Sequence, residues 1–224
     1  MKAFILAAGR GERMRPLTDS IPKPLLMVGG EPLIVHTIRR LSAAGVSDLV
    51  INVSHLSDQI EASLGDGSQW GVRIDYSREK TALETAGGII NALPLLGDSS
   101  FILVNGDIWT DYDFSNLTKR PLANSLAHLV MVSNPEHHPQ GDFCLYHGRL
   151  VQEGGEALTY SGIGLYSPAL FSDLPPGKRP LAPILRQAIS GSQLSAEKFS
   201  GIWVDVGTPE RLSELDIYLT SQSG

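Results

Sequence analysis

The sequence predicts an α/β fold built around one mixed, mainly parallel β-sheet. Strand-like and helix-like segments alternate about four times in the first 110 residues, as in parallel strands joined by right-handed helical crossovers. The first segment, residues 2–8, is an uninterrupted apolar run, which is typical of a strand buried on both faces. The length of 224 residues and the hydrophobic content of 42% suit a globular protein with a sizeable core.

In the first half, each element is recognised from the spacing of its apolar residues. A loop rich in glycine and proline covers 9–24. The segment 32–44 carries its apolar residues on one helix face, and Gly45 provides a stop. Pro94 is expected to lie just beyond the end of a helix. We expect strands at 2–8, 49–53, 72–76 and 101–104, and helices at 32–44, 58–64 and 85–93.

The second half is less regular. His147-Gly148 is a turn signal between two alternating runs. Thr208 is a suitable N-cap and Pro209 a suitable first residue for the closing helix. The proline-containing segment 134–141 is expected to be a loop inside a single domain. We expect strands at 127–132 and 158–166, a hairpin at 143–151, and helices at 181–190 and 209–219.

Charge and composition exclude several classes of protein. The 18 Lys and Arg against 24 Asp and Glu give a net charge of −6, so the chain has no general attraction to nucleic acid or to anionic membranes. Its one cysteine, Cys144, precludes an internal disulfide and fits a reducing compartment. The sequence has no membrane-length apolar stretch, and its N-terminal apolar run is too short for a signal peptide. We expect a cytoplasmic monomer.

The strongest signal is the glycine loop that follows the first strand. Gly9 and Gly11 leave backbone N–H groups open to an anion at the carboxyl end of a parallel strand. The loop is not a P-loop, because Gly11 is followed by Glu12-Arg13 rather than Lys-Ser/Thr. It is not a dinucleotide fingerprint either, because Met14 stands where a third glycine is needed. A plain strand-to-helix turn with solvated arginines is the alternative.

Lys23 lies between Pro22 and Pro24. A proline disfavours the helical conformation of the residue before it, so we expect Lys23 to be extended and stiffly presented. Beside the glycine loop, this ammonium group is a candidate phosphate ligand. A surface loop lysine is the alternative.

Two aspartates follow apolar runs of the sequence, and the first of them, Asp107, is expected at the sheet edge that carries the glycine loop. Asp107 comes after the strand at 101–104, and Asp205 precedes the closing helix. Mg²⁺ usually takes one or two carboxylates together with substrate phosphates, so both are candidate ligands. Each has the alternative of a turn or cap residue, which we expect for Asp111 and Asp113.

Other catalytic sets are missing from the sequence. There is no zinc-ligand spacing and no Gly-x-Ser-x-Gly elbow. His137 and His138 lie in a loop bounded by prolines, and we expect them at the surface rather than as ligands. Cys144 lies on an alternating strand, and we expect it to be packed.

The motif Leu6-Ala-Ala-Gly-x-Gly-x-Arg-Met-x-Pro-Leu-Thr18, followed by Pro22-Lys23-Pro24, resembles the signature of the sugar-phosphate nucleotidyltransferases, also called nucleoside-diphosphate-sugar pyrophosphorylases. Val104-Asn105-Gly106-Asp107 and Trp203-Val204-Asp205-Val206-Gly207-Thr208 are similar to that family's two metal-aspartate motifs. The resemblance implies a Rossmann-like three-layer sandwich, the nucleotide-diphospho-sugar transferase fold. It implies one domain over 1–224, with a nucleotide-binding half at 1–115 and a sugar-binding half at 116–224.

The resemblance also implies roles for individual residues. Lys23 and Arg13 would be catalytic, and Asp107 and Asp205 would bind Mg²⁺. The implied nucleotide contacts are Gly9, Gly11, Glu12, Arg13, Lys23 and Gly88. The implied sugar-phosphate contacts are Asn105, Asp142 and Glu153. One departure concerns the base, because many UTP-using relatives carry a glutamine where this chain has Glu79.

The segments 83–88, 105–114 and 141–143 are similar to members of the family that act in peptidoglycan recycling. They imply transfer of UMP from UTP to N-acetylmuramate α-1-phosphate, with release of pyrophosphate. The shared motifs leave open another sugar 1-phosphate, such as mannose with GTP or glucose with UTP or dTTP. A non-catalytic nucleotide-sugar sensor on the same fold is a further alternative.

Overall fold

The computed structural model describes residues 1–222. Its main strands are β1 (Lys2–Leu6), β4 (Asp48–Val53), β5 (Arg73–Arg78), β6 (Phe101–Asn105), β8 (Ala127–Val132), β9 (Phe143–Tyr146), β10 (Arg149–Val151), β11 (Glu156–Tyr166) and β12 (Leu194–Lys198). Four short strands are β2 (Met27–Val28), β3 (Glu31–Pro32), β7 (Ile108–Thr110) and β13 (Trp203–Asp205). The helices are α1 (Leu33–Ala43), α2 (Ser57–Leu64), α3 (Glu84–Leu96), α4 (Ser115–Thr118), α5 (Ala182–Ser190) and α6 (Pro209–Gln222).

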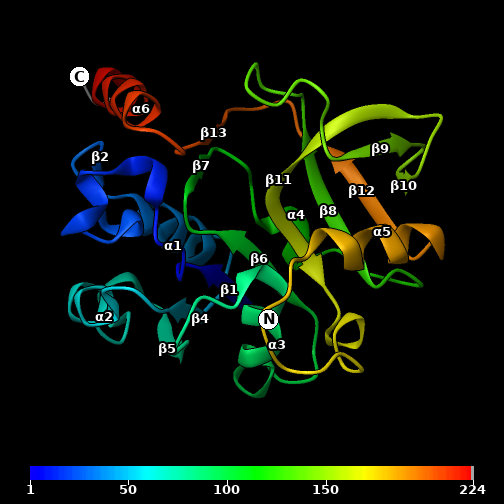
Figure 1. Cartoon of the computed structure of the whole chain (residues 1–224), viewed down its shortest axis with the longest axis horizontal. Helices are drawn as coiled ribbons and strands as arrows, with labels where there is room; N and C mark the ends of the chain where they lie inside the picture. The colour runs from blue at the N-terminus through cyan, green and yellow to red at the C-terminus, as the bar shows by residue number, and fades with distance from the viewer. Residues whose placement is uncertain (223–224) are drawn as a thin grey trace.

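A nine-stranded mixed sheet forms the centre, in the order β5-β4-β1-β6-β11-β8-β12-β10-β9 (Figure 1). The strands β5, β4, β1 and β6 are mutually parallel. β11 is antiparallel to both β6 and β8, while β12 is parallel to β8. The far end of the sheet curls, because β9 pairs with β10 and also with the start of β11. The predicted mixed sheet is confirmed; its parallel pairings lie in the β5-β4-β1-β6 part and between β8 and β12, while the other pairings are antiparallel.

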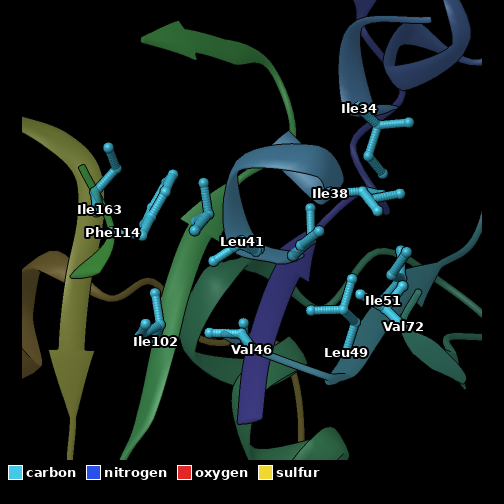
Figure 2. Close-up of a cluster of buried hydrophobic side chains, with 14 of the residues drawn as sticks. Ile34, Ile38, Leu41, Val46, Leu49, Ile51, Val72, Ile102, Phe114 and Ile163 are labelled. Carbon is cyan, nitrogen blue, oxygen red and sulfur yellow. The ribbon is translucent and has the colours of Figure 1, made fainter. Parts of the chain in front are cut away.

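Helices cover both faces of the sheet because its strands are apolar on both sides. On β1, Ile5 belongs to one core cluster and Phe4 to the other, as the alternation of a strand requires. Figure 2 shows the first cluster, in which Ile38 and Leu41 of α1 lie over the sheet face that carries Ile51 of β4 and Ile102 of β6. The second cluster joins α3 and α5 to the opposite face. The result is the expected three-layer arrangement.

A third, smaller core attaches α6 to the glycine-loop side of the molecule. Leu215 of α6 packs with Met14, which follows the glycine loop, and with Trp109 of β7. The edge of the Trp109 ring meets Tyr218, with ring centroids 6.0 Å apart. The closing helix therefore lies against the segment that ends in β2 (Figure 1), and Val204 of β13, the residue before Asp205, packs against the same core.

Most elements agree with the sequence within two residues, but two helix ends were wrong and several short strands were missed. The closing helix, expected at 209–219, continues to Gln222. The helix expected at 85–93 continues to Leu96 with Pro94 inside it. Pro94 lies in the last turn, where Gly97 N still bonds to Leu93 O at 2.9 Å, so one missing N–H does not end the helix. β12 was missed because three of its five residues, Ser195, Glu197 and Lys198, are polar. In residues 1–222, no helix is long and apolar enough to cross a membrane.

Candidate active site

The sheet brings the glycine loop and the first aspartate motif together. β1 lies between β4 and β6, and Leu6 pairs with Asn105. Gly106 N donates to Leu6 O at 2.8 Å, and a Cβ on Gly106 would lie 2.5 Å from that oxygen. Only glycine permits this approach, so Gly106 sets Asp107 beside the loop that follows β1.

Two cavities open at this edge of the sheet. The first has a volume of about 390 Å³ and includes the predicted nucleotide residues Gly9, Gly11, Glu12, Arg13 and Lys23 in its lining. The second has a volume of about 350 Å³ and includes the predicted residues Asn105, Asp142 and Asp205. Arg13, Asn105 and Asp107 line both, so the cavities meet at these residues.

Two predicted residues line neither cavity. Gly88 is buried in α3, where a Cβ would lie 2.7 Å from Glu79 Oε1. Glu153 is exposed beyond the end of β10. The structure therefore gathers the rest of the predicted set and leaves these two outside it.

The two glycines of the loop differ in their surroundings. Gly11 has a φ of +66°, and its Cβ would lie 3.0 Å from Thr18 Cγ2 and 3.1 Å from Lys23 Cβ. Thr18 Oγ1 donates to Gly11 O at 2.8 Å and holds the loop against this turn. Around Gly9 there is nothing within 4 Å of the Cβ position, so the protein itself does not require a glycine there.

Lys23 does not have the extended conformation that we predicted. Lys23–Leu25 form a single 3₁₀ turn, closed by Leu25 N donating to Pro22 O at 2.8 Å. Pro24 is tolerated because the second residue of a helical turn has no intrahelical use for its N–H. The side chain of Lys23 is only 9% exposed, and its Nζ donates to Asp107 Oδ2 at 2.6 Å.

The second predicted metal ligand lies on the strand next to Asp107. In the pair β7–β13, Asp205 stands opposite Ile108, and Val206 N donates to Asp107 O at 2.9 Å. Asp205 Oδ2 accepts from Arg211 Nη1 at 2.9 Å. Thr208 Oγ1 accepts from Arg211 N at 3.4 Å, as expected of the cap of α6.

The available ligands suit Mg²⁺, which also binds substrate phosphates, better than they suit a metal whose ligands all come from the protein. Asp107 and Asp205 line the same cavity and bring two carboxylates. Within residues 1–222 there is no group of three or more His, Cys, Asp or Glu side chains able to hold a metal. Mg²⁺ is commonly bound by one or two carboxylates plus substrate phosphates, so two aspartates suffice for it.

The histidines that we expected only at the surface line the second cavity. His138 Nε2 lies 3.2 Å from Asp142 Oδ1, and Asp142 Oδ2 accepts from Tyr160 N at 2.8 Å. His137 Nε2 lies 3.0 Å from Arg211 Nη1. Both histidine side chains are more than 40% exposed, so they are on the surface as predicted but face a site. No pattern in the sequence predicts the contact between His137 and Arg211.

Glu79 is a buried carboxylate in the wall of the first cavity. It is 6% exposed, its Oε1 accepts from Asn52 Nδ2 at 2.7 Å, and its Oε2 accepts from Leu83 N at 2.9 Å. Asn52 Oδ1 in turn accepts from Ala7 N at 2.6 Å, at the end of β1. This chain of bonds fixes the wall of the cavity relative to the glycine loop. Glu79 can offer a ligand only carboxylate oxygens, which accept hydrogen bonds, and no N–H donor.

Comparisons with known proteins agree with this geometry. A protein of Neisseria meningitidis named N-acetylmuramate alpha-1-phosphate uridylyltransferase is 51% identical over 224 residues, covering 96% of each chain. The mannose-1-phosphate guanyltransferase beta-B of Xenopus laevis is 31% identical; the match covers 99% of this chain and 65% of the frog protein.

The fold has a close counterpart among solved structures. A Bacillus anthracis crystal structure, described as a glucose-1-phosphate thymidylyltransferase in complex with sucrose, superposes with a TM-score of 0.88. It is 24% identical, and the match covers 98% of this chain and 95% of that chain. The family model described as "Nucleotidyl transferase" matches residues 2–145. With its glycine loop, Lys23 and paired aspartates in one place, the chain is a member of the nucleotidyl transferase family.

Proposed function

We propose that this enzyme transfers UMP from UTP to N-acetylmuramate α-1-phosphate, giving UDP-N-acetylmuramate and pyrophosphate. The observation that carries the proposal is the meeting of the two cavities at Arg13, Asn105 and Asp107. A nucleotide in the first cavity and a sugar phosphate in the second would bring their phosphates together there. The 51% identity to the Neisseria protein supports the choice of base and sugar.

The chemistry needs little from the protein beyond position and positive charge. A sugar-phosphate oxygen attacks the α-phosphorus in line as pyrophosphate leaves, and that oxygen is already ionised at pH 7. No general base is therefore required. The main demands are to hold two anions against their repulsion and to stabilise the charge of the leaving group.

The residues at the border of the cavities match these demands. Lys23 is nearly buried, so its ammonium group acts in a site with little water to screen it. It would contact the α-phosphate and the attacking phosphate. Arg13 and the loop N–H groups would hold the β- and γ-phosphates of UTP. Asn105 would orient the sugar phosphate from the end of β6.

Asp107 and Asp205 would hold Mg²⁺. When bound, the ion supplies charge neutralisation between the reacting phosphates. Without it, each aspartate has a cationic partner on the protein, Lys23 for Asp107 and Arg211 for Asp205. These ion pairs keep both carboxylates in place at the same cavity.

We also propose that the chain is one domain, in which one half binds the nucleotide and the other half binds the sugar. The lining of the first cavity comes from residues 6–107 and Gly207, which supports residues 1–115 as the nucleotide-binding half. Most of the lining of the second cavity comes from residues 108–205, which supports 116–224 as the sugar-binding half. A place in peptidoglycan recycling follows from the proposed sugar.

GTP with mannose 1-phosphate is a second candidate, and Glu79 is the observation that favours it. A carboxylate accepts hydrogen bonds, so it can pair with N3–H of uracil. It can also pair with the neighbouring N1–H and N2–H groups of guanine. The Xenopus relative makes the same alternative concrete.

Pyrophosphate release with Mg²⁺, over a grid of nucleoside triphosphates and sugar 1-phosphates, tests the proposal. We expect release with UTP and N-acetylmuramate 1-phosphate. Release only with GTP and mannose 1-phosphate would establish the second candidate and reject the first. No release with any pair, together with tight binding of a nucleotide sugar in calorimetry, would indicate a sensor.

A further inference from the structure

The second cavity poses an electrostatic problem for the proposed sugar. N-acetylmuramate differs from N-acetylglucosamine by a lactyl ether, whose carboxylate is ionised at pH 7. Three aspartates line this cavity, Asp107, Asp142 and Asp205. A substrate carboxylate would be repelled by them unless a cation of the protein meets it. The inference that follows rests on the proposed function.

The three cations at this site, Lys23, Arg13 and Arg211, differ in their positions. Lys23 is paired with Asp107, and Arg13 lies on the glycine loop, where the triphosphate is proposed to bind. Arg211 comes from the first turn of α6 and is paired with Asp205; it is not itself a lining residue of the second cavity but contacts two residues that are, Asp205 and His137. Its guanidinium group is permanently charged, and its side chain is 19% exposed.

Arg211 is held in place from two directions. Its Nη1 lies 2.9 Å from Asp205 Oδ2 and 3.0 Å from His137 Nε2. A Cβ on Gly207 would lie 2.4 Å from Nη2, so the glycine is what allows the guanidinium group to lie against the chain. In the part of the chain that the structure describes, both recorded side-chain contacts use Nη1. Nη2 lies beside Gly207, which lines the first cavity.

His137 extends this group into the cavity. A guanidinium group can only donate, so in this contact the Nε2 of a neutral His137 accepts and its Nδ1 is an N–H donor; the same Nε2 also lies 3.5 Å from Asp205 Oδ2. Its loop is anchored, because Asn134 Nδ2 donates to Pro139 O at 3.1 Å and to Ala157 O at 3.0 Å. Arg211 and His137 therefore place N–H donors next to Asp205, at a cavity that three aspartates line.

We infer that Arg211 and His137 bind the carboxylate of the sugar substrate and thereby select an N-acetylmuramate phosphate over uncharged sugar phosphates. Arg211 supplies the positive charge and the planar fork that suits a carboxylate. His137 supplies a neighbouring N–H group. The pair determines specificity and takes no part in breaking or forming the phosphate bonds.

The test compares two substrates that differ only in the lactyl ether. With UTP and Mg²⁺, kcat/KM is measured for N-acetylmuramate 1-phosphate and N-acetylglucosamine 1-phosphate. The variants are Arg211→Gln, Arg211→Lys and His137→Ala. The control is His147→Asn, an exposed turn residue with a φ of +47° that asparagine tolerates. Dissociation constants of both sugar phosphates from calorimetry provide a second measure that does not depend on turnover.

We expect the wild-type preference for the lactyl sugar to fall about 10- to 100-fold in Arg211→Gln, the range of a hydrogen bond to a charged group. Arg211→Lys should keep part of the preference because it keeps the charge without the fork. His137→Ala should lose several-fold. His147→Asn should leave the preference unchanged. If Arg211 only positioned Asp205, both substrates would suffer equally and their ratio would stay constant.

Failure of the inference is distinguishable from failure of the proposed function. An unchanged ratio in both Arg211→Gln and His137→Ala, with the wild type active on the lactyl sugar, would overturn the inference alone. So would a wild type that uses both sugars equally well. A wild type inactive on N-acetylmuramate 1-phosphate but active on another sugar phosphate would overturn the proposed function and this inference with it.

Discussion

Lys23 Nζ and Asp107 Oδ2 are 2.6 Å apart, and this ion pair joins two motifs that are 84 residues apart in the sequence. The side chain of Lys23 is 9% exposed, and the side chain of Asp107 is 36% exposed. The two partners therefore depend on each other unequally, because water can replace Lys23 around Asp107 more easily than it can replace Asp107 around Lys23.

This asymmetry separates the effects of the two alanine variants. Lys23→Ala should reduce kcat/KM by at least about 10²–10³, the loss typical of one preorganised donor to a developing charge. The fold should remain stable, since Asp107 can be hydrated. Pyrophosphate release and a thermal melt measure the two effects, with Lys119→Ala, at an exposed lysine, as the control. Near-normal turnover would remove Lys23 from the proposed chemistry.

Asp107→Ala should lose activity and also stability. The ammonium group of Lys23 would stay buried without its carboxylate, and a buried donor left without its acceptor costs about 1–3 kcal/mol, and more when it is charged. We expect a lower midpoint in urea than for Lys23→Ala. Midpoints in the reverse order would contradict the burial argument.

Asp107 and Asp205 should act together in binding a divalent cation. Asp205→Asn and Asp107→Asn should each weaken Mn²⁺ binding in the presence of UTP, measured by electron paramagnetic resonance, and should abolish Mg²⁺-dependent turnover. Asp98→Asn, at an exposed position, is the matched control. Unchanged Mn²⁺ affinity in either site variant would exclude that aspartate as a ligand.

Much of this fold was predictable from the sequence because each of these elements has its own local pattern of apolar or turn residues. The strand at 127–132 and the turn at His147-Gly148 appear in the structure at those residues. β12 and β13 were not predictable in this way. Their polar or very short sequences become strands only by pairing, β12 with β8 and β13 with β7. That pairing depends on residues more than 60 positions away.

The candidate site divides along the same line. The glycine loop, Lys23 and the two aspartates were found because each lies in a continuous motif. The contact between Arg211 and His137 joins residues 74 apart, in a helix start and a proline-bounded loop, and neither segment carries a motif for it. The conformation of Lys23 was wrong for a related reason, since the local preference before Pro24 yields to the turn that buries its side chain.

The two glycines of the loop should respond differently to alanine. Gly11→Ala should lower the free energy of unfolding by about 1–2 kcal/mol, because its φ of +66° disfavours a side chain and Thr18 and Lys23 lie near 3 Å. Gly9→Ala should fold like the wild type, because its Cβ would meet open space. If the first cavity binds UTP against this loop, Gly9→Ala should still weaken UTP binding, by about tenfold or 1.4 kcal/mol.

Urea denaturation and calorimetric titration with UTP separate these effects. A Gly9→Ala variant with normal stability and normal UTP affinity would place the nucleotide away from Gly9. A Gly11→Ala variant as stable as the wild type would show that the strain at Gly11 is relieved by local movement.

Glu197 of β12 lies far in the sequence from the loop motifs and links three segments of the chain, which carry Tyr112, Arg120 and His128. Its carboxylate accepts from the Tyr112 hydroxyl and, at 2.7 Å, from Arg120 Nη2, while His128 Nε2 lies 3.7 Å from Oε2. The His128 ring is the main cause that lowers the pKa of Glu197 from 4.5 to about 2; Tyr112 and Arg120 add to it against the effect of burial.

A lowered carboxyl pKa means that the folded state favours the charged form. Its contribution to stability is therefore complete above about pH 4.5 and disappears as the pH falls through about 2. Glu197→Gln should lower the free energy of unfolding by about 2 kcal/mol at pH 7, a value discounted for the partial exposure of the site. The gap between wild type and variant should narrow steadily below pH 4.5.

Urea midpoints between pH 3 and pH 7 measure this gap, and Glu214→Gln, at an exposed position on α6, is the control. The control should show a small gap with little dependence on pH. A gap for Glu197→Gln that is as large at pH 3 as at pH 7 would mean that its effect comes from lost packing. The ionised carboxylate between Tyr112, His128 and Arg120 would then contribute nothing to the free energy of unfolding.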